Sequence, residues 1–324
     1  MTHAIRVHRH GGPEVLTWEE VNVPAPGPGE VQLRHTAIGV NFVDTYFRSG
    51  LYKAASLPFV PGNEGVGVVT AIGPGVEGFH EGDRVAYATA TGSYSEVRNA
   101  PAAMLVHVPD AIDDRTAAAM MLKGLTVRYL VRRTHAIKPG DVILLHAAAG
   151  GVGLILTQWA RHLGATVIGT VGSEEKAELA RANGADHVIL YRDEDFVKRV
   201  REITSGKLCD VVYDGIGQAT YPASLDCLRP LGLWVSYGNA SGAITNFDLL
   251  LLSQKGSLYA TRPTLNTFVA KREELVGASN ELFEVVLSGA VKIPVHQTHP
   301  LKDARHAHEE LEARRTTGST LLLP

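Results

Sequence analysis

A glycine-rich turn at residues 147–153 has residue types and a spacing that could bind phosphate. It reads Ala147-Ala-Ala-Gly-Gly-Val-Gly153, after the aliphatic run Val142–Leu145 and before apolar residues at helical spacing. Against the pattern G-x-G-x-x-G, Gly150 and Gly153 match the second and third glycines, and Ala148 replaces the first. Gly150 would let the backbone approach a pyrophosphate, Gly153 would let the helix pack on the strand, and N–H groups at the helix start would receive the phosphate charge. We therefore predict a dinucleotide site rather than an ordinary tight turn.

The end of the next expected strand indicates which dinucleotide is bound. A site for NAD usually carries an acidic residue about 20 positions on, at the tip of the second strand. Here that tip reads Thr170-Val-Gly-Ser173, and Glu174 and Glu175 follow where they suit the first turn of a helix capped by Ser173. Lys176 lies one turn into that helix. A hydroxyl and a lysine without a tip carboxylate favour NADPH over NADH, although Ser173 could be a plain N-cap and Lys176 an ordinary surface lysine.

The segment Pro61-Gly-Asn-Glu-Gly-Val-Gly67 resembles the loop in which a histidine of alcohol dehydrogenases holds catalytic zinc, but Asn63 stands at that position. A catalytic zinc site needs about three ligands from Cys, His or carboxylate. Gly39-Val-Asn41-Phe-Val-Asp44 offers no thiolate, and Glu64 alone does not make a site. We expect no metal. We interpret the remaining histidine groups as surface residues, the last of them on an exposed helix: His3, His8 and His10; His296 and His299; His306 and His308.

Two regions of the sequence, each with its own pattern of secondary structure, must position these residues. Residues 1 to about 120 are rich in Gly, Pro and Val, with short β-like runs between turns, which predicts a mainly antiparallel β domain. Strands and helices alternate from about 122 to 265, which predicts a parallel, doubly wound Rossmann sheet. The tail after 266 ends in the strand-like run Ser319–Leu323 and should return to the first domain. We expect an α/β protein with domains at 1–121 plus 266–324 and at 122–265, and a cleft between them that could hold the active site.

Composition narrows the class of protein. The 324 residues are 45% hydrophobic and 20% charged with a net charge of −3, which indicates a folded domain and makes nucleic acid an unlikely partner. The N-terminus lacks the apolar region of a secretory signal, and the longest aliphatic run, Leu249–Leu252, is too short to span a membrane. The two cysteines, Cys209 and Cys227, form no CxxC pair and suit a reducing compartment. We expect a cytoplasmic protein.

In addition to these motifs, the sequence resembles one known protein family over essentially its whole length. The sequence is similar to the zeta-crystallin-like quinone oxidoreductases of the medium-chain dehydrogenase/reductase superfamily. The resemblance implies a GroES-like catalytic domain, a Rossmann domain, NADPH, no zinc, and a homodimer or homotetramer. The segments that carry it are 39–46, 48–52, 61–67, 121–126, 147–153, 236–242, 261–263 and 315–319.

The resemblance also implies roles for individual residues. Lys176, Tyr191 and Arg315 would hold the adenosine 2′-phosphate, and Tyr237, where relatives often carry Phe, would flank the nicotinamide with Gly238. Tyr46 and Tyr52 could instead only pack, Asn41 could cap a turn, and Arg315 could be an exposed cation at a helix end. The expected residues of the quinone site are Asn41, Tyr46 and Tyr52. The expected cofactor-binding residues are Asn41, Thr126, Gly150, Gly151, Val152, Gly153, Gly172, Ser173, Lys176, Tyr191, Ile216, Tyr237, Gly238 and Arg315.

The expected function is NADPH-dependent reduction of a quinone that lies against the nicotinamide. A quinone is already electrophilic and needs little Lewis-acid help, which fits the loss of the zinc ligand. The pocket would position the quinone and donate hydrogen bonds to the developing oxyanion. Two alternatives stay open: an NADPH-dependent reductase of enals or enones, and a non-catalytic NADPH-binding protein with a structural or RNA-binding role. A zinc alcohol dehydrogenase fits least.

Overall fold

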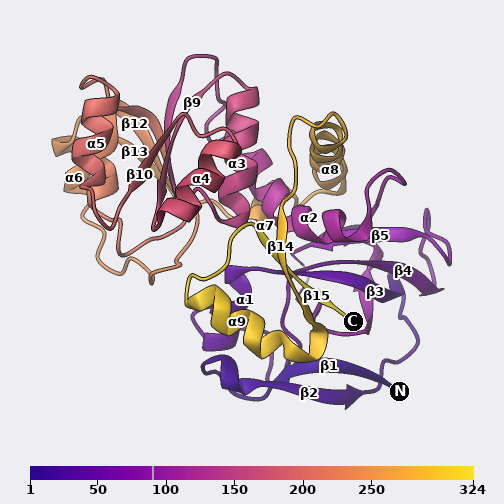
Figure 1. Ribbon diagram of the computed structural model, residues 1–324. Helices are drawn as coiled ribbons and strands as arrows, with labels where there is room; N and C mark the ends of the chain where they lie inside the picture. Colours follow the sequence, from indigo (N-terminus) through magenta and orange to yellow (C-terminus); the bar gives the residue numbers. More distant parts are fainter. Residues whose placement is uncertain (90) are drawn as a thin grey trace. The chain divides into compact units, whose positions relative to one another are not determined.

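The computed structural model describes residues 1–89 and 91–324, and the chain divides into two compact units. The first unit comprises Met1–Leu125, Val269–Leu287 and Ile293–Pro324. The second comprises Thr126–Phe268 and Ser288–Lys292. Since the first unit takes segments from both ends of the chain, the second unit is an insertion into it (Figure 1).

A parallel sheet forms the centre of the second unit. Its strand order is β10-β9-β8-β11-β12-β13, and every neighbouring pair is parallel. Numbered along the chain, this is the 3-2-1-4-5-6 order of the doubly wound dinucleotide-binding fold. The predicted Rossmann sheet is therefore confirmed. The strands are β8 (Val142–His146), β9 (Thr166–Val171), β10 (His187–Leu190), β11 (Cys209–Asp214), β12 (Leu228–Ser236) and β13 (Tyr259–Thr261).

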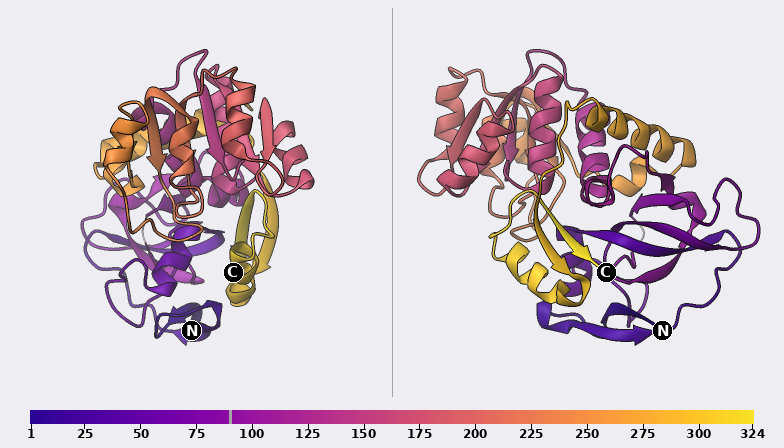
Figure 2. Two further views of the ribbon diagram at one scale, coloured as in Figure 1. Left: turned by 90° about the vertical axis from the view of Figure 1, so that its left-hand side faces the viewer. Right: turned by 45° about the vertical axis from the view of Figure 1, so that its right-hand side comes forward.

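Helices flank this sheet because its strands are apolar on both faces (Figures 1 and 2). Leu144, Ile168 and Val212 belong to one buried cluster with Val200 of α5, so α5 covers the face on which these alternate side chains lie. Trp159 of α3 is fully buried. The helices of this unit are α3 (Gly151–His162), α4 (Glu174–Ala182), α5 (Phe196–Ile203), α6 (Leu250–Gln254) and α7 (Leu265–Phe268).

The first unit is mainly antiparallel, as predicted. In its described residues the larger sheet has the order β14-β15-β3-β4-β5-β7, with β6 also paired to β3, and only β14 and β15 run parallel. β1 and β2 form a separate antiparallel pair. The strands are β1 (Thr2–Val7), β2 (Leu16–Val21), β3 (Glu30–Val40), β4 (Glu64–Ile72), β5 (Arg84–Ala88), β6 (Val97–Pro101), β7 (Val106–His107), β14 (Val295–Pro300) and β15 (Ser319–Leu323).

The C-terminal strand and helix pack beside the strand that leads into the first helix. β15 pairs with the end of β3, where Leu321 lies opposite Gly39. Ala304 and Ala307 of α9 share a buried cluster with Ile38 of β3. Ile5 and Val7 near the N-terminus belong to the same cluster, so the two ends of the chain pack together. The helices of this unit are α1 (Phe42–Ser49), α8 (Arg272–Leu287) and α9 (Ala304–Glu312), and α2 (Asp114–Tyr129) crosses the division between the units.

Among the residues that the structure describes, no helix has both the length and the apolar character that crossing a membrane requires.

Candidate functional site

The predicted cofactor residues of the second unit gather at one edge of its sheet. The carboxyl ends of parallel strands meet at the same edge, where ligands bind in doubly wound folds. Each of five strands is followed there by residues expected to contact the cofactor. They are Gly150 to Gly153 after β8, Gly172, Ser173 and Lys176 after β9, Tyr191 after β10, Ile216 after β11, and Tyr237 with Gly238 after β12.

The glycine-rich turn has the geometry that the sequence predicted. Gly150 is the N-cap of α3 in an extended conformation, and among the described residues no side chain caps this helix start. A Cβ on Gly153 would lie 2.3 Å from the carbonyl oxygen of Ala147, so only glycine fits there. A Cβ on Gly150 would meet only the same oxygen, at 3.3 Å, so its outward side is open to a ligand. The N–H groups of the first helical turn lack intrahelical acceptors, and the start of α3 can therefore hold an anion.

The tips of β9 and β10 form a polar corner beside this turn. Ser173 is the N-cap of α4, and its Oγ accepts the Lys176 backbone N–H at 3.4 Å. Tyr191 is 39% exposed, and its hydroxyl would lie 2.8 Å from a Cβ on Gly172. Gly172 thus leaves room for the tyrosine hydroxyl at the strand tip. No carboxylate occupies the tip itself, and Glu174 and Glu175 lie in the first turn of α4.

A second cation at this corner was missed in the sequence analysis. The Nε of Arg192 would lie 3.4 Å from a Cβ on Gly172, so the guanidinium extends over the same glycine as the Tyr191 hydroxyl. Its position next to Tyr191 in the chain was the only available signal. With Lys176 on α4, the corner offers two cations and two hydroxyls, which is a donor set suited to a phosphate monoester.

A buried carboxylate orders the loop after β11, and backbone hydrogen bonds, such as the Tyr237 N–H to the Asp214 carbonyl at 2.8 Å, join this loop to the one after β12. Asp214 Oδ1 accepts the N–H of Ile216 at 2.9 Å. The ring of Tyr237 lies against Gly215, where a Cβ would come within 2.9 Å of it. A Cβ on Gly238 would lie 2.4 Å from the Gly215 carbonyl oxygen. The backbone here is therefore closely packed, and it fixes Tyr237 at the carboxyl edge of the sheet.

The other predicted cofactor residues lie elsewhere along the chain. Thr126 is buried within α2, at the start of the second unit. Arg315 and Asn41 belong to the first unit. Arg315 is exposed between α9 and β15, where its N–H donates to the Glu310 carbonyl at 3.1 Å. Their roles at the cofactor stay predictions.

Asn41 takes part in a buried charged group of the first unit. Its Nδ2 donates to Glu64 Oε2 at 2.8 Å, and Lys123 Nζ lies 3.1 Å from the same oxygen. The other oxygen of Glu64 accepts the N–H of Leu122 at 2.8 Å. Glu64 is fully buried and Lys123 is 5% exposed, so this is a paired and hydrogen-bonded interior ion pair. The ion pair fixes the Asn41 amide, and no role of Lys123 was predicted from the sequence.

A second buried carboxylate binds both Asn41 and Asn63. Asp44 accepts the backbone N–H of Asn41 at 2.8 Å, the Asn63 Nδ2 at 2.7 Å and the Tyr94 hydroxyl at 3.1 Å. Burial raises the pKa of Asp44 to about 6, although these hydrogen bonds and the Lys123 charge oppose the rise. Asp44 therefore positions the start of α1 and the Asn63 loop together.

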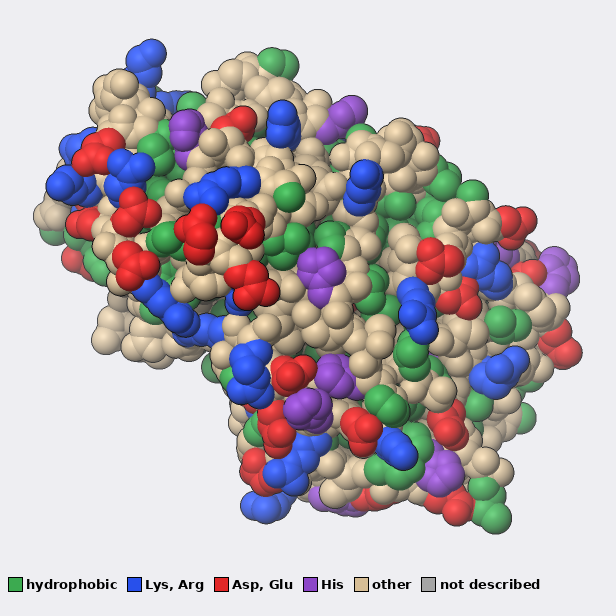
Figure 3. Space-filling view, in the orientation of Figure 1, with side chains coloured by type: hydrophobic (Ala, Val, Ile, Leu, Met, Phe, Trp, Pro, Cys, Tyr) green, Lys and Arg blue, Asp and Glu red, His purple; other side chains and the backbone are tan. Residues whose placement is uncertain are grey.

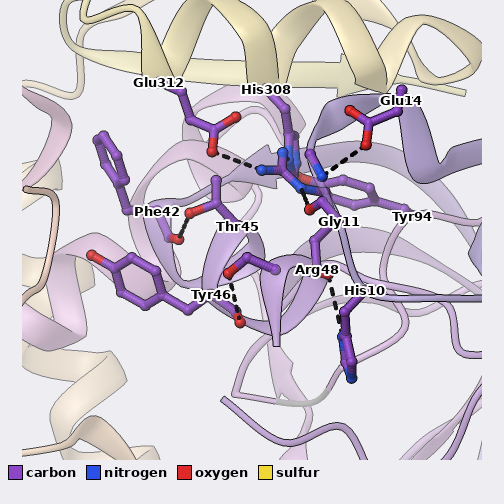
Figure 4. A network of polar contacts seen from close by, with 12 residues as sticks. His10, Gly11, Glu14, Phe42, Thr45, Tyr46, Arg48, Tyr94, His308 and Glu312 are labelled. Carbon is purple, nitrogen blue, oxygen red and sulfur yellow. Dashed lines mark hydrogen bonds and ion pairs between the residues drawn. The ribbon is translucent and has the colours of Figure 1, made fainter. Parts of the chain in front are cut away.

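A chain of buried hydrogen bonds continues from Tyr94 to the surface (Figure 4). Tyr94 Oη lies 2.9 Å from His308 Nε2, Arg48 Nη1 lies 2.9 Å from His308 Nδ1, and Arg48 Nη2 pairs with Glu312 at 2.7 Å. Since arginine can only donate, Nδ1 accepts and Nε2 carries the proton that is donated to Tyr94. Burial, with the Arg48 charge, lowers the pKa of His308 to about 3, so the ring is neutral.

The expectation that His308 lies on an exposed helix surface was therefore wrong, because this residue is fully buried against α1. Helical spacing alone placed it beside His306, which is exposed. The partner that decides its burial, Arg48, is 260 positions away in the sequence.

The two tyrosines of the predicted quinone site are in contact. The rings of Tyr46 and Tyr52 meet edge to face, with centroids 5.2 Å apart. Tyr46 is 8% exposed and points away from the Arg48 network, although both residues lie on α1 (Figure 4). α1 therefore carries Asn41 at its N-terminus, Tyr46 on one side and the Arg48 anchor on another.

The residues around Asn63 do not fit a catalytic zinc ion. Asn63 uses its amide nitrogen on Asp44, and its oxygen accepts the Thr91 hydroxyl at 3.1 Å. Glu64 already faces the Lys123 ammonium. Among the described residues, no cysteine or histidine lies close enough to Asn63 and Glu64 to complete a group of three metal ligands. These side chains satisfy one another without a cation.

Comparisons with known proteins agree with this architecture. Residues 27–110 match the alcohol dehydrogenase GroES-like domain, and residues 151–277 match the family described as zinc-binding dehydrogenase. The chain is 55% identical to the quinone oxidoreductase of Salmonella typhimurium, with all of both chains covered. It is similar to the structure of Escherichia coli quinone oxidoreductase complexed with NADPH, with a TM-score of 0.98 and 53% sequence identity. This similarity covers 99% of the present chain and 100% of the Escherichia coli chain. It is also 49% identical to a 2-haloacrylate reductase of Burkholderia, with 100% of this chain and 99% of the relative covered.

Proposed function

The chain belongs to the quinone oxidoreductase family of the medium-chain dehydrogenase/reductase superfamily, and from this membership we propose that it catalyses the NADPH-dependent reduction of quinones. One observation carries the proposal in this chain. The carboxyl edge of its parallel sheet combines an uncapped helix start at Gly150 with a cationic corner around Lys176. The first suits a pyrophosphate and the second suits a 2′-phosphate, and NADPH contains both.

The second unit would bind the cofactor through the residues at this edge. The start of α3, from Gly150 to Gly153, would receive the pyrophosphate. Lys176, Tyr191 and Arg315 would hold the 2′-phosphate, with Ser173 beside them. We add Arg192 to this group because its side chain extends over Gly172. Tyr237 and Gly238 would flank the nicotinamide. We assign Gly151, Val152, Gly172, Ile216, Thr126 and Arg315 to the same cofactor.

When bound, NADPH supplies two electrons and a proton, as one hydride or one electron at a time, and the quinone takes up one further proton to become a hydroquinone. The chain's own task is to orient the quinone and to stabilise the charge that develops on its oxygen. We assign this task to Asn41, Tyr46 and Tyr52. The position of Asn41 supports the assignment: its side-chain amide donates to Glu64 at 2.8 Å and its backbone N–H donates to Asp44 at 2.8 Å, so the residue is fixed before any substrate binds.

Domain roles follow from these assignments. We propose that residues 1–121 and 266–324 form the GroES-like catalytic domain and that residues 122–265 form the NADPH-binding domain. We also propose a homodimer or homotetramer, which light scattering of the purified protein tests, and a cytoplasmic location. The location is supported by Cys209 and Cys227, which are buried and unpaired with each other, as suits a reducing compartment.

A second candidate function is the reduction of an activated alkene. The 2-haloacrylate reductase relative, 49% identical over the whole chain, favours it, because a haloacrylate is a conjugated alkene by name. The same cofactor would serve, and the hydride would go to the β-carbon. A non-catalytic NADPH-binding role is the remaining alternative.

The acceptor decides between these functions. We would treat the purified protein with a chelator and compare kcat/KM for 1,4-benzoquinone and for a simple enal, both with NADPH. Faster turnover of the quinone supports the proposal. A higher kcat/KM for the enal would move the function to alkene reduction, and NADPH binding without turnover of either acceptor would favour the non-catalytic role.

A further inference from the structure

Two histidines and a glutamate, none of which has a role assigned above, meet on the surface of the first unit. His299 lies on β14, and His306 and Glu310 are four residues apart on one face of α9. One ligand atom from each residue lies within 4.8 Å of the others. The two imidazole rings are edge to face, with centroids 5.3 Å apart. Histidine and acidic side chains gather over α9 on the face shown in Figure 3.

The imidazole of His299 is incompletely satisfied in this cluster. Its Nε2 is buried, yet among the described residues it has no hydrogen-bond partner. The carboxylate oxygen Glu310 Oε2 lies 3.4 Å from this nitrogen without the geometry of a hydrogen bond. A buried polar atom without a partner is unfavourable, so this nitrogen is suited to a ligand that is not a protein donor or acceptor.

We propose that His299, His306 and Glu310 bind a divalent transition metal ion, with Zn²⁺ as the best fit. Two imidazoles and one carboxylate form a three-ligand set that zinc accepts with water in a fourth position. The same set disfavours Mg²⁺ and Ca²⁺, which prefer oxygen ligands. A tetrahedral zinc site would bring the ligand atoms to about 3.4 Å from one another, which requires only small side-chain rotations. His306, 57% exposed, has room for such a rotation.

Such an ion would tie α9, which supports α1, to a neighbouring strand. It would link β14 to α9, and α9 carries the His308 and Glu312 side chains that hold Arg48. The site shares no residue with the Asn63 loop or with the proposed cofactor residues. Its role would be to stabilise the docking of α9, since a ligand that binds only the folded state raises its stability.

The test is a metal titration of the full chain without substrate or cofactor. We would remove metals with a chelator, titrate Zn²⁺ by calorimetry, and titrate Co²⁺ while recording its visible absorption. We expect one saturable site that is filled below about 0.1 mM metal, with Co²⁺ bands of a four- or five-coordinate ion. His306→Gln and Glu310→Gln should each weaken Zn²⁺ binding at least about tenfold.

The matched control is His296→Gln, which changes another histidine of β14 that is exposed and bonded to Thr317. This variant should bind Zn²⁺ as the wild type does. Absence of saturable binding in the wild type overturns the proposal. Equal binding by His306→Gln and the wild type also overturns it, because His306 is exposed and its loss should leave the fold intact. Since no turnover is measured, the outcome does not depend on the proposed activity.

Discussion

Arg48→Met should loosen the docking of α1 against α9. Arg48 is 1% exposed and donates to His308 Nδ1, to the Gly11 carbonyl at 3.2 Å and to Glu312. Met keeps most of the apolar stem but cannot donate. The substitution therefore leaves a buried imidazole nitrogen and a partly buried carbonyl without their donor.

The size of the effect follows from these three contacts. An unsatisfied buried acceptor costs about 1–3 kcal/mol, and the Gly11 hydrogen bond contributes about 1 kcal/mol. The pair with Glu312 adds little, about 0–1 kcal/mol, because that carboxylate is 38% exposed and can return to water. Removing the buried charge regains part of its desolvation energy, so we expect a loss of about 3 kcal/mol.

Hydrogen exchange followed by mass spectrometry measures this loss locally. Exchange of amides in α1 and α9 should accelerate roughly 100-fold, since about 1.4 kcal/mol corresponds to a factor of ten. Arg305→Met is the matched control, because Arg305 is 58% exposed and pairs with Glu309 on the surface of the same helix. Exchange in Arg48→Met that matches this control would refute the account of Arg48 as a buried anchor.

Four further predictions concern the cofactor, the substrate and pH. Gly153→Ala should lower NADPH affinity at least about tenfold in a fluorescence titration, because its Cβ would meet a backbone oxygen at 2.3 Å. Lys176→Met should raise the KM for NADPH roughly tenfold or more while changing that for NADH little; equal changes for both would contradict the 2′-phosphate role. Tyr46→Phe and Tyr52→Phe should alter quinone kinetics while NADPH affinity stays nearly constant, and unchanged kinetics in both would count against the pocket assignment. Burial, with the Arg98 charge, lowers the pKa of His35 to about 3. The contribution of neutral His35 to the free energy of unfolding is therefore complete above about pH 6.5 and is lost as the pH falls toward 3. The urea midpoint of His35→Gln should fall less steeply than that of the wild type over this range.

The parts of the site that could be predicted from the sequence are those formed by residues close together in the chain. The turn from Ala147 to Gly153 joins a strand to a helix within a few residues, and its glycine spacing reflects contacts between near neighbours. The Ser173 cap is equally local, because its Oγ accepts from a residue three positions on. The doubly wound fold was predictable because alternating strands and helices allow few arrangements.

The buried polar partners could not be predicted in this way. Glu64 and Lys123 are 59 positions apart, and Tyr94 and His308 are 214 apart. Nothing in the local pattern around Lys123 or His308 distinguishes a buried partner from a solvated side chain. Their burial is decided by tertiary packing, which one sequence does not reveal.

The most direct test of the central claim is the rate of NADPH oxidation by the chelator-treated protein with 1,4-benzoquinone, with NADH as the comparison. The account predicts rapid oxidation of NADPH with formation of hydroquinone, and a kcat/KM at least about tenfold lower with NADH, because the cationic corner at Lys176 has no phosphate to hold. Equal rates with the two cofactors would contradict the phosphate site, and no oxidation of NADPH by the quinone would contradict the function itself.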